Sequence, residues 1–232
     1  MQIKRIKQIL LCGASGLWLC LATQLCAATH LAQPTETLDH VVAVVNDDII
    51  TQTELTHTIN FIKKEMAQSQ TQTPIPKMET LQKQILEQLI NKKLQLQLAN
   101  QAGLTLTTTE LNQAIAHIAQ QNHVSQNMLY HHLQQDGLSI TEYRQTIHDQ
   151  LMIQKLQEQE VASKITLSQQ EIAQFIKTHP QAQAAHLSTS QLSSLLFQQK
   201  FEIAMATWLQ KIRNQAFIQI MPSSFTTLTK KT

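Results

Sequence analysis

Histidine is the residue of this 232-residue sequence that could most readily do chemistry, because there are ten of them and some lie close together. His131 and His132 are adjacent, and His117 and His123 lie six positions apart. On a helix, both spacings place the side chains on different faces, whereas zinc needs three or four converging ligands. We therefore predict no metal site, and expect at most that these histidines make binding depend on pH.

Cysteine and serine chemistry is not indicated either. All three cysteines, Cys12, Cys20 and Cys26, lie within the first 28 residues, and the sequence has neither a Gly-x-Ser-x-Gly motif nor a glycine-rich phosphate loop. The acidic pair Asp47-Asp48 lies between two apolar segments, where Asp favours tight turns for backbone reasons alone. The sequence therefore predicts no catalytic residue and no cofactor.

Methionine and aromatic side chains are the remaining residues that could recognise a partner, because such side chains suit adaptable apolar binding surfaces. Four of them are expected near helix ends or loops and are our candidates for a peptide-binding groove: Phe61, Met66, Met128 and Tyr130. Three others follow the i, i+4, i+7 spacing of a packed helix face and are expected in the core: Phe201, Met205 and Trp208.

Residues 1–28 have the layout of a secretory signal peptide, with a basic start, an uncharged apolar middle and small residues at the end. We expect cleavage after Ala28, with Ala27 or Ala32 as alternatives. Left uncut, the segment would anchor the chain in a membrane. A lipoprotein signal fits poorly, because Gln24-Leu25 stands before Cys26 where small residues are needed.

Removal of the leader leaves a chain without thiols, which must be held together by its core rather than by disulfides. The leader contains three of the 18 basic residues and none of the 16 acidic ones, so the remainder has a net charge of −1. Binding to nucleic acid or to an anionic membrane is therefore not indicated, since both need clustered basic charge. The abundant glutamines lie within periodic segments and are expected on solvated helix faces.

The order of elements follows from apolar periodicity, from Gly and Pro breakers, and from four Ser/Thr-x-x-Glu capping boxes that begin at Thr51, Thr107, Ser139 and Ser168. We predict strands at 41–45, 48–50 and 216–221. We predict helices at 52–68, 77–102, 108–122, 126–135, 140–163, 169–178 and from 191 onward. The fold class is therefore mostly α with a small amount of strand.

The domain organisation predicted from these elements has five parts. They are a signal peptide at 1–28, a helical N-terminal domain at 29–180, a short polar linker at 181–190, a C-terminal helix and strand at 191–221, and a frayed tail at 222–232. The strands at 41–50 have unpaired edges, and the segment at 216–221 is the other strand-like stretch. We expect the two chain ends to pair as a small β clasp.

Three segments together resemble the N-terminal domain of SurA, the periplasmic chaperone for outer-membrane proteins: "DHVVAVVNDDIIT", "QDGLSITEYR" and "WLQKIRNQAFIQI". The resemblance implies a multi-helix domain that is closed by its C-terminal strand. SurA proteins usually carry parvulin prolyl-isomerase domains before the C-terminal helix, but too few residues separate Pro180 from "AFIQI" for one here. The resemblance, without a parvulin domain, therefore implies a protein that is not an enzyme.

The function implied by this resemblance is an ATP-independent periplasmic holdase. Its expected partners are unfolded outer-membrane protein precursors and, beyond them, the outer-membrane assembly machinery. Neither nucleic acid nor membrane is expected as a partner, except through an uncut leader. Two alternatives stay open: a foldase related to prolyl isomerases, and an adaptor dedicated to one envelope or secretion assembly.

Overall fold

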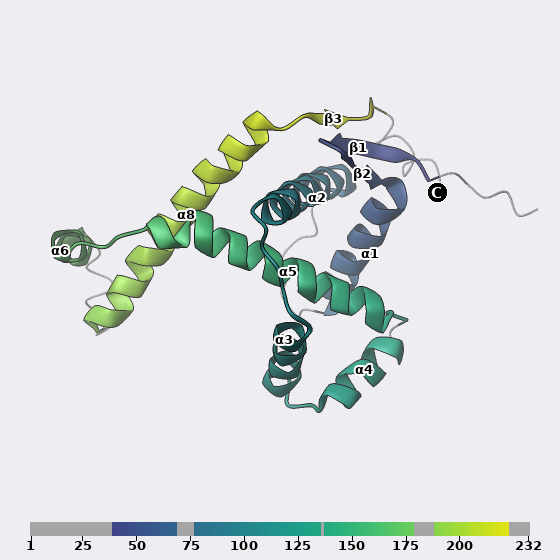
Figure 1. Cartoon of the computed structure of the whole chain (residues 1–232), viewed down its shortest axis with the longest axis horizontal. Coiled ribbons are helices and arrows are strands. Elements are labelled where there is room, and N and C mark those ends of the chain that lie inside the picture. Colours follow the sequence, from purple (N-terminus) through teal and green to yellow (C-terminus); the bar gives the residue numbers. More distant parts are fainter. Residues whose placement is uncertain (1–38, 69–76, 136, 179–187, 223–232) are drawn as a thin grey trace, which may run out of the picture. The chain divides into compact units, whose positions relative to one another are not determined.

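The computed structural model describes residues 39–68, 77–135, 137–178 and 188–222. The predicted leader lies outside these residues, as do 181–187 of the predicted linker and 223–232 of the predicted tail. The described part is mostly helical and contains a small antiparallel sheet, so the predicted fold class is confirmed (Figure 1).

The N-terminal strands form a hairpin. Strand β1 (Val41–Val45) pairs antiparallel with β2 (Asp48–Thr51), and β-branched residues favour this extended backbone. Asn46 in the connecting turn has φ +52°, a left-handed conformation that Asn tolerates better than most residues. Of the acidic pair predicted for the turn, Asp47 lies in it beside Asn46, whereas Asp48 is the first residue of β2.

The C-terminal strand β3 (Ile218–Ile220) pairs antiparallel with β1, which gives the strand order β2-β1-β3. Asn46 reinforces this pairing twice, because its backbone N–H donates to Phe217 O at 2.8 Å and its Oδ1 accepts from Phe217 N at 2.8 Å. The two ends of the described chain therefore meet in one sheet, and the predicted clasp is confirmed.

The helices lie close to their predicted positions. Their bounds are α1 Gln52–Gln68, α2 Met78–Gln101, α3 Thr108–Gln121, α4 Gln126–Gln135, α5 Ile140–Glu160, the 3₁₀ helix η1 Ala162–Lys164, α6 Gln169–Thr178 and α8 Thr189–Gln215. The predicted capping boxes are complete at the starts of α3 and α6. At the starts of α1 and α5, the hydroxyls of Thr51 and Ser139 accept from the amide three residues on.

Three elements differ from the prediction by two residues or more at one end. Helix α8 begins at Thr189 rather than Gln191, because Ser188 and Gln191 form a capping box. Gln191 here takes the position that Glu has in the predicted boxes. Helix α5 ends at Glu160, and η1 forms the last turn of the predicted helix. Strand β3 has three residues rather than six, since only 218–220 lie in register with β1.

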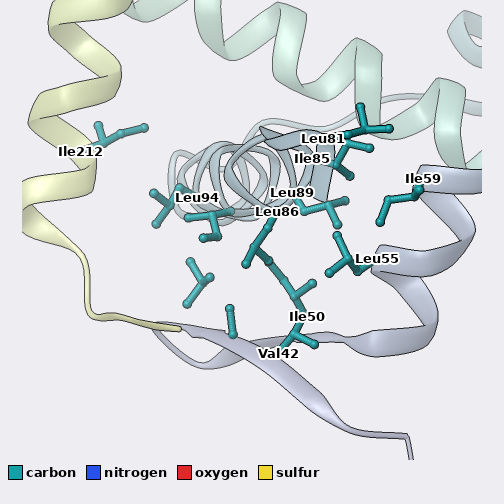
Figure 2. Packing of buried hydrophobic residues seen from close by; sticks show 13 residues of the cluster. Val42, Ile50, Leu55, Ile59, Leu81, Ile85, Leu86, Leu89, Leu94 and Ile212 are labelled. Atoms are coloured by element: carbon teal, nitrogen blue, oxygen red, sulfur yellow. The ribbon is translucent and has the colours of Figure 1, made fainter. Parts of the chain in front are cut away.

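Helix α2 is the centre of the main core, where its apolar face meets the sheet and two other helices, α1 and α8 (Figure 2). Val42 and Ile50 approach it from the sheet, Leu55 and Ile59 from α1, and Ile212 from α8. Six α2 side chains in this cluster are at most 8% exposed: Leu81, Ile85, Leu86, Leu89, Ile90 and Leu94. The main core therefore needs both chain ends, because α8 and β3 supply part of the cover.

A second cluster joins α2 to α5. Ala99 packs with Met152 and Leu156, and the half-buried Trp208 of α8 packs against this cluster as well as the first. Polar contacts reinforce the same joint, because Lys92 Nζ lies 2.8 Å from Asp149 Oδ2. Trp208 therefore connects the two clusters.

Asn46→Ala tests the importance of the clasp. The change removes the side-chain hydrogen bonds to Phe217 N and to Gln97 Oε1. Alanine at this positive φ has no side-chain hydrogen bond to offset the backbone strain. We expect the free energy of unfolding to fall by about 2–3 kcal/mol in urea denaturation. Asn46→Gly should lose less, because glycine adopts this φ freely.

An exposed asparagine on α3 provides the control, because Asn112→Ala should change stability by no more than about 0.5 kcal/mol. Equal stability of Asn46→Ala and the unmodified chain would show that the turn does not hold the clasp.

Candidate functional site

The exposed large apolar side chains of the described residues gather on α8 and the segment that follows it. Leu195, Phe197 and Ile203 on α8 are 42%, 36% and 62% exposed, and Phe217 and Ile220 after it are 60% and 39% exposed. The others are divided among four other elements, namely Ile49, Phe61, Met78 and Met128. Leu195, Phe197 and Ile203 lie on different faces of α8, but the concentration of such residues on one segment makes this segment the candidate interaction surface.

Helix α8 exposes these residues because it buries different faces at its two ends. Leu192 and Leu196 are buried near the start, where α8 contacts α6, and Ile212 is buried near the end, where α8 contacts α2. Leu196 and Ile212 are separated by about 160° around the helix at about 100° per residue. Each apolar face therefore continues along the helix beyond the element that covers it.

The face that packs on the core at Trp208 and Ile212 continues toward the helix start as an aromatic stripe. We define this stripe as Phe197, Phe201, Met205 and Trp208. The rings of Phe197 and Phe201 stack with their centroids 6.3 Å apart and an interplanar angle of 14°. Phe201, Met205 and Trp208, which were predicted to lie in the core, are all half-buried, and Trp208 is the one that packs against both core clusters.

Two polar contacts hold the start of α8 in place. Lys200 Nζ donates to Glu171 Oε1 at 2.5 Å and to the carbonyl oxygen of Thr166 at 3.0 Å, so α8 is fastened to the loop before α6. Near the other end, Arg213 donates to Glu87 Oε2 at 2.6 Å and to Asn91 Oδ1 at 2.7 Å on α2. The aromatic stripe therefore lies between two anchored ends.

The contact at Lys200 repeats an arrangement found between α3 and α5. Lys155 Nζ donates to Glu110 Oε1 at 2.6 Å and to Thr105 O at 3.0 Å, and Glu110 also completes the capping box of α3. The lysine, together with the capping residue, lowers the pKa of each glutamate to about 2. Both glutamates therefore stay ionised in the folded protein well into the acidic range.

A pocket of about 830 Å³ lies at the clasp. Its apolar wall comes from α2 and the end of α8, with Leu94, Leu98 and Ile212. Its polar rim includes Asp47 of the hairpin turn, and Phe217 lies at its border. We call it the clasp pocket. This pocket could not be predicted from the sequence, because its walls come from three segments that meet only once β3 pairs with β1.

The four residues predicted for a peptide-binding groove lie on two helices. Phe61 is 43% exposed and Met66 is half-buried, both on α1, which packs on α2 and β2. Met128 is 49% exposed on α4, which packs on α3 and α5, and the Tyr130 hydroxyl accepts from Gln126 at 2.9 Å and Arg144 at 3.2 Å. The four residues form two pairs on helices with different neighbours, so a groove that joins them stays a prediction.

Histidines and carboxylates are the remaining side chains that could bind a metal ion. Within the described ranges, no three His, Cys, Asp or Glu side chains are placed to hold a metal ion. His117 and His131 each lie 3.1 Å from a glutamine amide one turn along their own helix. None of the described helices has the length and apolar character needed to cross a bilayer.

The hairpin and the helices that follow it match a known protein family. Residues 38–157, which include the hairpin and the helices from α1 into α5, match the SurA N-terminal domain. This chain belongs to the SurA N-terminal domain family. The match covers the hairpin half of the clasp, and the structure adds the C-terminal strand that pairs with it.

Curated relatives named "Chaperone SurA" support the assignment. The protein of Nitrosospira multiformis is 38% identical over 143 residues, which are 62% of this chain and 32% of that protein. The protein of Chromobacterium violaceum is 36% identical over 165 residues, which are 71% of this chain and 37% of that protein. The chain therefore spans about a third of the length of the curated relatives it matches.

A solved structure has the same fold. It comes from a study of PEB4 and the periplasmic protein Cj1289, described as two structurally related SurA-like chaperones of Campylobacter jejuni. It aligns with a TM-score of 0.58 over 79% of this chain and 100% of its own, at 13% sequence identity. At this identity the likeness concerns the fold.

The lysine contacts predict how stability depends on pH. The folded pKa of Glu171 is about 2, below the ordinary value of 4.5, so its contribution to stability is complete above pH 4.5 and is lost as pH falls toward 2. In Lys200→Gln the folded pKa of Glu171 should rise toward its ordinary value. We therefore expect the variant to lose less thermal stability than the unmodified chain between pH 5 and pH 3.

Lys164→Gln provides the control for this measurement, because Lys164 pairs with Glu160 within four residues and does not touch Glu110 or Glu171. Its melting temperature should fall with pH as in the unmodified chain. An unchanged acid loss in Lys200→Gln would contradict the assignment of Glu171 as the titrating group.

Proposed function

We propose that this chain is an ATP-independent chaperone of the periplasm that holds unfolded outer-membrane protein precursors and has no prolyl isomerase activity. The observation that carries the proposal is the apolar surface of α8 and β3, which is exposed in a domain of the SurA N-terminal family. The outer-membrane assembly machinery is the proposed partner that receives the precursors.

The chemistry of this surface suits a holdase. Covering one of its exposed apolar side chains contributes about 1–2 kcal/mol, and the bound chain loses conformational entropy on ordering. Several such contacts are therefore needed, and none of them requires a fixed sequence in the client, the unfolded polypeptide that is held. Binding of this kind is promiscuous and reversible without an energy source.

The proposed compartment and clients rest on the relatives. The matched proteins of Nitrosospira multiformis and Legionella pneumophila are named "Chaperone SurA", and the resemblance of the sequence to SurA implies outer-membrane clients. The predicted leader agrees with export. The proposed lack of isomerase activity rests on the short segment between α6 and β3, which leaves no room for a parvulin domain there.

The aggregation of an unfolded porin tests the holdase directly. We expect the chain, exported with its own leader and then purified, to suppress aggregation at a near-stoichiometric ratio in a light-scattering assay. Phe197→Ser combined with Phe201→Ser should raise the required ratio several-fold, because client contacts on the aromatic stripe are lost. Circular dichroism should show an unchanged helix content, since neither residue is buried.

Ile49→Ser with Met78→Ser is the matched control, because it removes two similarly exposed apolar residues from other elements and should leave suppression unchanged. Phe61→Ser with Met128→Ser tests the groove predicted from the sequence. A folded chain that suppresses no aggregation would refute the holdase, and proline-peptide isomerisation above the background rate would favour the foldase.

Photo-crosslinking in cells separates the chaperone from a dedicated adaptor. A photoreactive amino acid placed at Phe61, Tyr130 or Phe197 captures whatever lies next to each surface. We expect many β-barrel precursors in the captured material, because contacts by apolar area do not select one sequence. A single dominant partner at all three positions would favour the adaptor.

A further inference from the structure

The outer edge of β3 offers unpaired main-chain groups. In the ladder with β1, Asn46 N–H donates to Phe217 O at 2.8 Å and Met221 N–H donates to Val42 O at 2.9 Å. Antiparallel ladders use alternate residues on each edge, so the amides and carbonyls of Ile218 and Ile220 point away from β1. No strand of the described residues pairs with this side of β3.

The edge also lacks the charges that usually protect an exposed strand. Residues 216–221 contain no charged side chain and no proline, and Pro222 follows them. Phe217 and Ile220 leave 60% and 39% of their surfaces exposed. An edge of this kind is a template for another extended chain.

The clasp pocket lies at the start of the same strand. Ala216 and Phe217 border it, and Leu94, Leu98 and Ile212 form its apolar wall. Its volume of about 830 Å³ is ample for one large side chain. Recognition by strand addition combines main-chain hydrogen bonds at an edge with pockets for individual side chains, and both features meet here.

We infer that the outer edge of β3 binds an extended segment of an unfolded polypeptide as an added strand, and that the clasp pocket receives one apolar side chain of that segment. This inference rests on the proposed function, because a holdase meets chains whose main-chain groups are unpaired. The carboxylates of Asp47 and Asp48 at the pocket favour a neutral or basic neighbouring residue over an acidic one.

A second copy of this chain fits the edge less well than an unfolded segment. Two three-residue strands paired edge to edge cover little surface, whereas a stable interface needs about 1,000 Å² or more. A longer unfolded segment can pair with β3 and reach the pocket at the same time. The edge therefore suits an extended client better than self-association.

Proline substitution separates the edge from the fold. Ile220→Pro removes an outward N–H and adds ring atoms at the edge, yet it leaves the β1 ladder intact, because the N–H of Ile220 does not point toward β1. Ile220→Thr is the matched control, since it changes the side chain and keeps the N–H. The probe is a fluorescein-labelled twelve-residue peptide that alternates valine with threonine. Its binding is measured by fluorescence anisotropy.

We expect Ile220→Pro to raise the Kd of the peptide at least about tenfold, and Ile220→Thr to change it about threefold or less. A peptide with the same side chains and N-methyl groups on its four central residues should bind the unmodified chain at least about tenfold more weakly. This second measurement does not depend on how any variant folds. Equal binding of the plain and methylated peptides would overturn the inference.

Other occupants of the edge give different results. A dimer of the purified chain that Ile220→Pro dissociates, without peptide binding, would assign the edge to a second copy and overturn the inference. Peptide binding that arises only after removal of residues 223–232 would assign it to the chain's own tail and overturn it for the full chain. Porin aggregation suppressed equally by the unmodified chain and Ile220→Pro, with unchanged peptide binding, would refute the edge and leave the holdase standing.

Discussion

The hydrogen bonds between β1 and β3 are the interaction on which the rest of this structure depends. Phe217 N and Asn46 Oδ1 are joined at 2.8 Å across 171 positions of sequence. A two-stranded hairpin is marginal in water, and the third strand gives the sheet a width that can be stable against a helix. The same pairing brings α8 back to α2, where Ile212 and Trp208 complete the main core. Loop-closure entropy opposes this contact, so the burial it brings must offset that cost.

The return of α8 also creates the surfaces that we propose bind clients. A helix fixed at both ends by different partners cannot bury one face along its whole length, and α8 buries nearly opposite faces at Leu196 and Ile212. The exposure of Phe197 and Phe201 is therefore a consequence of how the helix is anchored. The clasp pocket and the β3 edge arise from the same closure, so all three surfaces belong to the C-terminal segment that completes the fold.

Local signals in the sequence were sufficient for the elements, because capping boxes and Gly or Pro breakers act within a few residues. Four boxes predicted helix starts, and Gly103 and Gly137, both at positive φ, predicted helix ends. The structure has helix boundaries at these places. The start of α8 was missed because Gln191 performs the part usually given to Glu. A capping-box pattern that accepts Gln as well as Glu at the third helical position predicts the start of α8 at this place. The pairing of the chain ends was predictable, since two strand-like segments each lacked another partner.

The candidate site was less predictable, because it depends on which side of each helix is covered. Apolar spacing placed Phe201, Met205 and Trp208 on one face correctly, yet spacing alone does not say where the covering helix ends. The glutamines show the same limit: many were expected on solvated faces, but Gln95 is 7% exposed and its Oε1 accepts from Gln157 on α5 at 2.7 Å. Gln97 likewise donates to Asp48 at 2.8 Å and to Val45 O at 2.9 Å.

These glutamines suggest how an apolar surface of the kind proposed to hold clients can exist on a folded, weakly charged protein. Long amide side chains satisfy backbone and side-chain groups at the α2 joints, beside ion pairs such as Lys92 with Asp149. The aromatic stripe contains no charged side chain, so it does not itself repel clients of either sign. Because contact area then supplies most of the binding energy, release requires only that the client bury the same apolar side chains in its own fold.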